Sequence, residues 1–115
     1  MSRPLAIGLR AWIAGHDLYV RAAVELLIRH GVWLRRDEFV EACVRTPSDG
    51  SCWIDWRAAR EAFDAGELRR ASSTEVALLD FAIALGEDRY RFNHMGEANT
   101  RLLLAATAHA LGGRR

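Results

Sequence analysis

Apolar residues recur at helical spacing along most of the chain, and glycine, proline or short polar residues separate the segments that carry this pattern. Asp55 is placed to cap the start of one helix, and Ser72 with Glu75 forms the capping-box pattern before another. Gly31 and Gly66 follow helical segments and suit the left-handed conformation that ends helices. The pattern predicts six helices, over about residues 5–13, 18–30, 37–45, 56–65, 73–85 and 94–111.

Two of these segments, residues 73–85 and 94–111, are apolar on nearly every side of the predicted helix. A helix that is apolar all round is usually buried at the centre of a protein. We therefore expect these two helices to form the middle of the fold. One core of this size can also leave part of the last helix uncovered, and a homodimer is an alternative way to cover it.

Short β-like runs occupy residues 32–34 and 52–54, and residues 90–92 are a third candidate. The first two runs lie twenty residues apart, and each precedes an amphipathic segment, so the chain contains a faint internal similarity. If the two runs pair, they form a small ribbon. The predicted fold is therefore all-α, mainly helical, with two or three very short strands, and residues 1–115 are long enough for a single domain.

All 16 basic side chains are arginine, and the chain contains no lysine. Together with many alanines and glycines, this composition is typical of a high-GC genome, of a bacterium or its phage. The arginines are therefore weak indicators of function. Acidic residues accompany them, and the net charge of +1 does not require a nucleic acid or an anionic membrane as partner.

The sequence contains no motif of a known catalytic, nucleotide-binding or metal-binding type. Its four histidines and two cysteines do not have the short spacings of metal ligands. The apolar stretches are too short for a membrane span or a signal peptide. We therefore expect a cytoplasmic protein that is not an enzyme and has no cofactor, no metal and no structural disulfide.

The tryptophans give the best candidate for a functional surface. Alternate residues of a strand face opposite sides, so Trp33 and Trp53 point away from Leu34 and Ile54 if the two runs pair. Arg35 then lies on the same face as Trp33. Tryptophan and arginine are enriched at the binding hot spots of protein interfaces. The alternative is that a helix covers the ribbon and both indole rings belong to the core.

Arg57 and Arg60 lie on the predicted solvent side of the fourth helix, next to this ribbon in sequence. The candidate partner-binding residues are therefore Trp33, Arg35, Trp53, Arg57 and Arg60. The expected function is that of a small, non-catalytic protein-interaction module or subunit. A winged-helix-like, nucleic-acid-binding regulator is the alternative, because short strands among helices and scattered arginines also suit that class.

Overall fold

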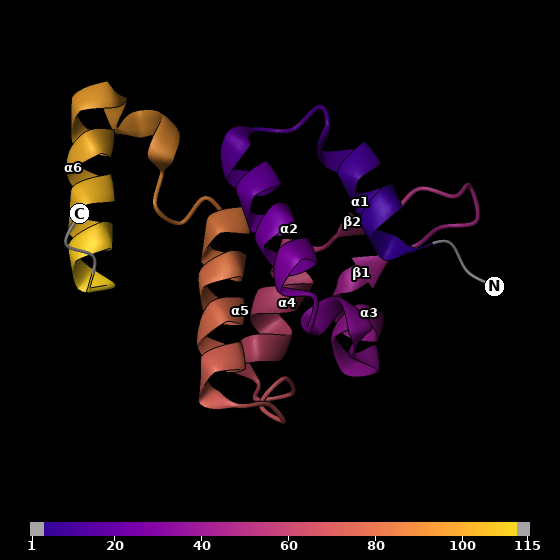
Figure 1. The fold of residues 1–115 in the computed structure, drawn as a ribbon. Helices are drawn as coiled ribbons and strands as arrows, with labels where there is room; N and C mark the ends of the chain where they lie inside the picture. Colours follow the sequence, from indigo (N-terminus) through magenta and orange to yellow (C-terminus); the bar gives the residue numbers. More distant parts are fainter. Residues whose placement is uncertain (1–3, 113–115) are drawn as a thin grey trace.

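Six α-helices and one two-stranded antiparallel ribbon make up the computed structural model, which describes residues 4–112 (Figure 1). The mainly helical fold class is confirmed. The helices are α1 (Leu5–Ile13), α2 (Leu18–His30), α3 (Asp37–Cys43), α4 (Trp56–Asp64), α5 (Ser73–Gly86) and α6 (Gly96–Ala110). The strands are β1 (Val44–Arg45) and β2 (Trp53–Ile54), and two 3-10 helices are η1 (Trp33–Arg35) and η2 (Phe92–His94).

Local hydrogen bonds explain where several helices begin and end. The Ser72 hydroxyl accepts a bond from the Glu75 backbone N–H at 3.2 Å, and the Glu75 carboxylate accepts one from the Ser72 N–H at 3.1 Å. The Asp55 carboxylate accepts a bond from the Ala58 N–H at the start of α4. Gly31 ends α2 with a φ of +75°, a conformation that disfavours other residues. These predictions are confirmed.

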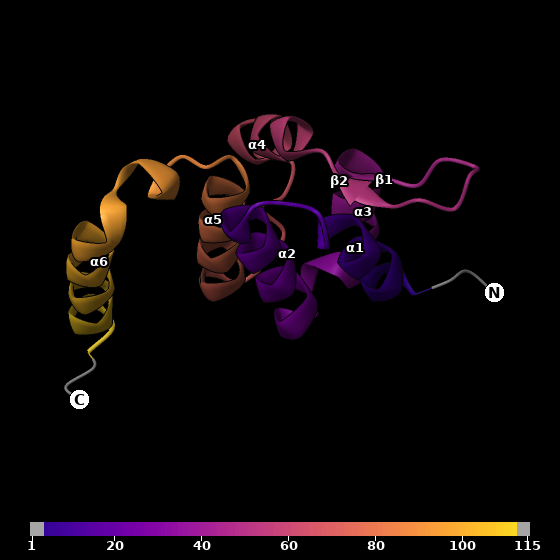
Figure 2. The ribbon, with the colours of Figure 1, turned by 90° about the horizontal axis from the view of Figure 1, so that it is seen from above.

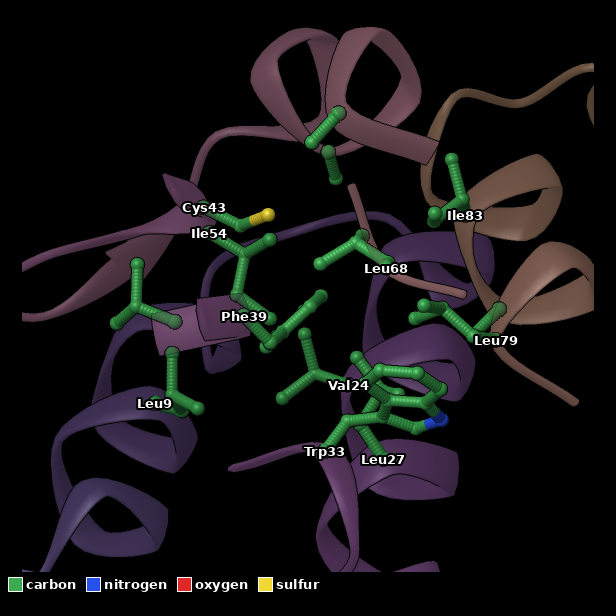
Figure 3. Close-up of a cluster of buried hydrophobic side chains, with 14 of the residues drawn as sticks. Leu9, Val24, Leu27, Trp33, Phe39, Cys43, Ile54, Leu68, Leu79 and Ile83 are labelled. Carbon is green, nitrogen blue, oxygen red and sulfur yellow. The ribbon is translucent and has the colours of Figure 1, made fainter. Parts of the chain in front are cut away.

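The core lies where α2 and α5 pack together and α1, η1, α3 and β2 close around them (Figure 3). Phe39, Leu27 and Leu79 are fully buried there. The prediction that residues 73–85 form a central helix is therefore confirmed for the side of α5 that carries Leu79 and Ile83.

The same prediction is wrong for the last helix. No residue of α6 is buried, and the helix stands apart from the rest of the molecule in both views (Figures 1 and 2). An apolar surface all round a helix indicates that the helix needs cover. It does not indicate which chain supplies that cover. In this structure, residues 4–112 leave α6 uncovered.

The observed ribbon also differs from the predicted one, in which residues 32–34 and 52–54 would pair. Strand β2 pairs with β1, with Val44 opposite Ile54 and Arg45 opposite Trp53. Residues 32–34 lie in the short connection between α2 and α3, which forms the 3-10 turn η1 instead of a strand. Residues 90–92 enter η2 and are not a strand. The internal similarity therefore does not mark two equivalent units.

Trp56 of α4 lies directly against the backbone of Gly86 at the end of α5. A Cβ atom at Gly86 would overlap the indole ring of Trp56. The indole ring of Trp56 is half-buried in this contact and packs against the core. The close approach of α4 to the end of α5 therefore depends on the absence of a side chain at position 86.

Replacing Gly86 with alanine is expected to lower the free energy of unfolding by about 1–3 kcal/mol, because the new methyl group forces the indole or the helix to move. Urea denaturation measures this loss. The matched control is Gly15→Ala, since a Cβ at Gly15 meets no neighbouring atom within 4 Å. The control should stay within about 0.5 kcal/mol of the natural protein. Equal effects at both glycines would contradict the contact.

Candidate interaction surfaces

The structure does not bring the five candidate residues together, and Trp33 is not on the surface at all. Its side chain is 1% exposed, and its indole N–H donates a hydrogen bond to the backbone carbonyl of Glu75 at 3.0 Å. The guanidinium of Arg36 lies 5.0 Å from the centre of the ring. Trp33 therefore belongs to the core, as the alternative interpretation of the sequence expects, and its ring is not exposed on a surface.

Trp53 does lie on the outer face of the ribbon. It is 37% exposed, whereas Ile54 next to it is 2% exposed, as the alternation along a strand predicts. The arginine opposite Trp53 is Arg45, whose guanidinium is paired with Asp55 at 3.3 Å. Sequence reasoning missed Arg45 because β1 has only two residues and directly follows α3.

Arg35 lies on a different side, at the edge of a shallow hollow between α1, α3 and the connection from β1 to β2. The hollow has a volume of about 580 Å³, and its lining includes Leu5, Val40 and Cys52. Trp53 is not among the lining residues. Arg35 and Trp53 therefore do not form one surface.

Arg57 and Arg60 occupy α4 but differ in their surroundings. The side chain of Arg57 is 91% exposed, and its nearest carboxylate, Glu61, is 4.0 Å away. The side chain of Arg60 is 16% exposed and binds Asp80 at 3.1 Å and Glu87 at 3.2 Å. Burial opposes the charge of Arg60, but these two carboxylates outweigh that effect and raise its pKa. Arg60 thus ties α4 to α5 and is not available to a partner.

Exposed apolar side chains gather on α6 instead. Leu102, Leu104 and Leu111 are 68%, 64% and 82% exposed. Because a helix turns about 100° per residue, Leu104 and Leu111 lie on one side of α6 and Leu102 lies on nearly the opposite side. Only Glu97 and Arg101, paired at 3.2 Å, carry formal charges along α6. Helical spacing places this pair in the first turns of α6, on the side of Leu104, so the helix is apolar on opposite sides only beyond Arg101.

The described hydrogen bonds and ion pairs of α6 side chains stay within the helix and its first turn. Asn99, Thr100 and Thr107 donate to backbone carbonyls four residues earlier. The extended position of α6 also shows in the radius of gyration of 15.1 Å, against about 13 Å for a compact chain of this size. Within residues 4–112, α6 is therefore tied to the body mainly through its connection.

A second apolar surface lies on the side of α5 that faces away from α2. Thr74, Ala77 and Phe81 follow one another at helical spacing there, and Phe81 is 45% exposed, whereas Leu78 beside them packs against the core. The charged side chains of Arg60, Asp80 and Arg89 border this surface. Tyr90 lies 6.0 Å from Phe81 between ring centres, and Phe92 lies 5.6 Å from Tyr90. We call Ala77, Phe81 and Tyr90 the outer face of α5. The all-round apolar sequence of this helix is the signal that predicts it.

The described residues hold little that suggests other chemistry. Across residues 4–112, no group of three or more histidine, cysteine or acidic side chains is placed to hold a metal ion. Burial is the main cause that raises the pKa of the Cys43 thiol to about 12, so this thiol stays protonated at neutral pH. None of the described helices is long and apolar enough to cross a membrane.

Known proteins offer no guide to this arrangement. No protein-family model matches the chain, and comparisons with curated proteins and with solved structures found no match either.

Proposed function

We propose that the protein is a small, non-catalytic interaction module and that α6 is its partner-binding helix. The exposure of Leu102, Leu104 and Leu111 on a helix without buried residues is the observation that carries this proposal. Monomeric proteins rarely leave a continuous apolar surface of this kind in water. An isolated helix of about 15 residues is also only marginally stable in water, so α6 gains stability from a partner.

The charges favour this function over a winged-helix-like regulator. In a helix-turn-helix arrangement the second helix enters the major groove of DNA. The corresponding helix here, α3, exposes Asp37, Glu38 and Glu41, which repel phosphate groups. Seven of the described arginines are also paired with carboxylates: Arg10, Arg36, Arg45, Arg57, Arg60, Arg89 and Arg101.

We also keep the prediction that Trp53 contacts the partner, because its ring is exposed on the outer face of the ribbon. A cytoplasmic location also remains part of the proposal. The buried free thiol of Cys43 suits a compartment in which cysteines stay reduced.

The test replaces two exposed leucines of α6 with a good helix former, in the double variant Leu102→Glu/Leu104→Glu. Affinity capture with the natural protein is compared with capture by the variant, followed by binding measurements on the partner obtained. The variant should bind that partner at least about 30-fold more weakly, the loss expected at an interface hot spot. Leu18→Glu is the control, since Leu18 is 76% exposed on α2 rather than on α6. This control variant should bind the partner as the natural protein does.

The result would contradict the proposal if the double variant bound the partner as well as the control does. It would also contradict it if capture returned nucleic acid whose retention falls steeply with salt. If the natural protein is a monomer, a large fall in the thermal stability of the double variant would also contradict it, because exposed leucines contribute little to the stability of a folded monomer.

A further inference from the structure

We infer that the partner of α6 is a second copy of this chain, and that the two copies exchange their α6 helices. In this homodimer, α6 of one copy packs against the outer face of α5 in the other, and the two α6 helices also contact each other. The inference rests on the proposed function, since it names the partner of the same helix.

Among residues 4–112, the outer face of α5 and the sides of α6 are apolar surfaces that lie uncovered, and their shapes complement each other. The outer face of α5 presents the large rings of Phe81 and Tyr90, which are 45% and 38% exposed. Most of α6 consists of alanine and leucine, so it offers a smooth, narrow surface on which large rings can pack closely. Figure 1 shows α6 running back in the opposite direction to α5, but standing away from it.

The positions of the leucines distinguish a second copy from closure within one chain. If α6 folded back onto its own α5, either Leu102 or the pair Leu104 and Leu111 would be covered, because they lie on opposite sides. The other side would stay in water. A two-fold dimer covers both sides, since the partner supplies the outer face of its α5 and also its own α6.

The connection between α5 and α6 holds the helix outward. Asp88 and Arg91 both have left-handed backbone conformations, with φ of +54° and +52°, and Gly96 has φ of +77°. Residues other than glycine adopt this region at a cost in energy, so the connection is not a relaxed linker. The N–H of Arg89 donates to the carbonyl of Ala84 at 2.9 Å, and this bond fixes the first part of the connection on α5. Short, strained connections of this kind favour exchange between copies.

Size and charge also suit an identical partner. A helix of 15 residues is about 22 Å long and about 10 Å across, so its outer surface is roughly 700 Å². Two enclosed α6 helices therefore bring the dimer into the range of about 1,200–2,000 Å² that stable interfaces bury. The formal charges of Glu97 and Arg101 cancel along α6, so two copies of this helix do not repel each other.

Sedimentation equilibrium on the full chain tests the self-association. The natural protein should have twice the mass of the chain at micromolar concentration. Leu102→Glu/Leu104→Glu on α6 and Phe81→Glu on α5 should each weaken the dimer at least 30-fold, the loss expected at a hot spot. Leu18→Glu should leave the dimer intact. Circular dichroism confirms that each variant is folded, and a variant that is not is replaced by Leu104→Ala or Phe81→Ala.

Cross-linking tests the exchange itself. Two single variants, Ala77→Cys and Leu104→Cys, are given tags of different size, mixed, unfolded, refolded and treated with a short thiol cross-linker. A product that joins the two tags, and that is absent when either new cysteine is omitted and only Cys43 and Cys52 remain, shows that α6 of one copy lies on α5 of another. The same mixture with Leu102→Cys probes the opposite side of α6. If neither mixture gives the joined product, α6 does not occupy the outer face of α5 in a second copy.

The outcomes separate this inference from the proposed function. If the natural protein stays monomeric at about 100 µM, the inference that the partner is a second copy is overturned. The proposed function still stands if the natural protein binds a different protein and the α6 variant does not. A dimer that tolerates both the α6 and the Phe81 variants overturns the inference, because the interface lies elsewhere. A monomer whose thermal stability falls strongly in the α6 variant overturns both, because α6 then packs on its own chain.

Discussion

Replacing Trp33 with alanine is expected to lower the free energy of unfolding by about 3–5 kcal/mol, the usual loss for a large aromatic core residue. The ring is fully enclosed, and its removal also leaves the carbonyl of Glu75 without the indole N–H that it accepts. Chemical denaturation followed by circular dichroism measures the change, because the removed ring itself alters the fluorescence.

The matched control is Trp53→Ala, the other tryptophan that the sequence places in a β-like run. Trp53 is 37% exposed, so its removal should cost only about 1 kcal/mol. If Trp53→Ala were the more damaging of the two changes, the assignment of Trp33 to the core and of Trp53 to the surface would be wrong.

Truncating Leu79 to alanine is expected to cost about 2–5 kcal/mol, because Leu79 is completely buried where α5 packs on α2. Thermal and urea unfolding both report this loss. Leu18→Ala removes the same atoms from a leucine that is 76% exposed, and should change the stability by no more than about 0.5 kcal/mol. A small effect at Leu79 would show that α5 is not the central helix.

The sequence predicted the helical body well because the signals for helix ends act over a few residues. The Ser72–Glu75 capping box, the Asp55 cap and the left-handed Gly31 all form the local hydrogen bonds or backbone conformations that their residue types favour. The apolar composition of residues 73–85 also correctly predicted a buried helix, in which Leu79 and Ile83 are fully enclosed. None of these features depends on which distant segment packs nearby.

The candidate site was predicted less well because it depends on contacts between distant segments. The indole of Trp33 is buried by α2, α3 and α5, and no local pattern distinguishes it from an exposed ring. Arg60 lies on the polar side of α4, yet the carboxylates of Asp80 and Glu87 draw it into a bridge to α5. Strand β1 is too short to produce an alternating pattern, so the pairing of Arg45 with Trp53 was missed.

The error over α6 has a different physical origin. Its sequence correctly indicates a helix that is apolar on most sides, and the structure shows that helix with its leucines exposed. Composition describes the surroundings that a helix requires. It contains no information on whether those surroundings come from the same chain or from another.

Glu75 connects the start of α5 to the rest of the core. Its carboxylate binds both the Ser72 N–H and the guanidinium of Arg36, and its backbone carbonyl accepts the indole N–H of Trp33. The bond from the Ser72 N–H is the main cause that lowers the pKa of Glu75, and Arg36 adds to it. The stability gained from this carboxylate is therefore present above its ordinary pKa and is lost as pH falls through the lowered value.

Because these bonds share one residue, the first turn of α5 cannot fray without releasing Arg36 and the Trp33 indole. Helix ends usually open independently of the global structure, whereas this end belongs to the same cooperative unit as the core. The opposite holds for α6, which has no such attachment among the described residues. We therefore expect the backbone hydrogens at the start of α5 to exchange only when the whole fold opens, and those of an uncovered α6 to exchange much faster.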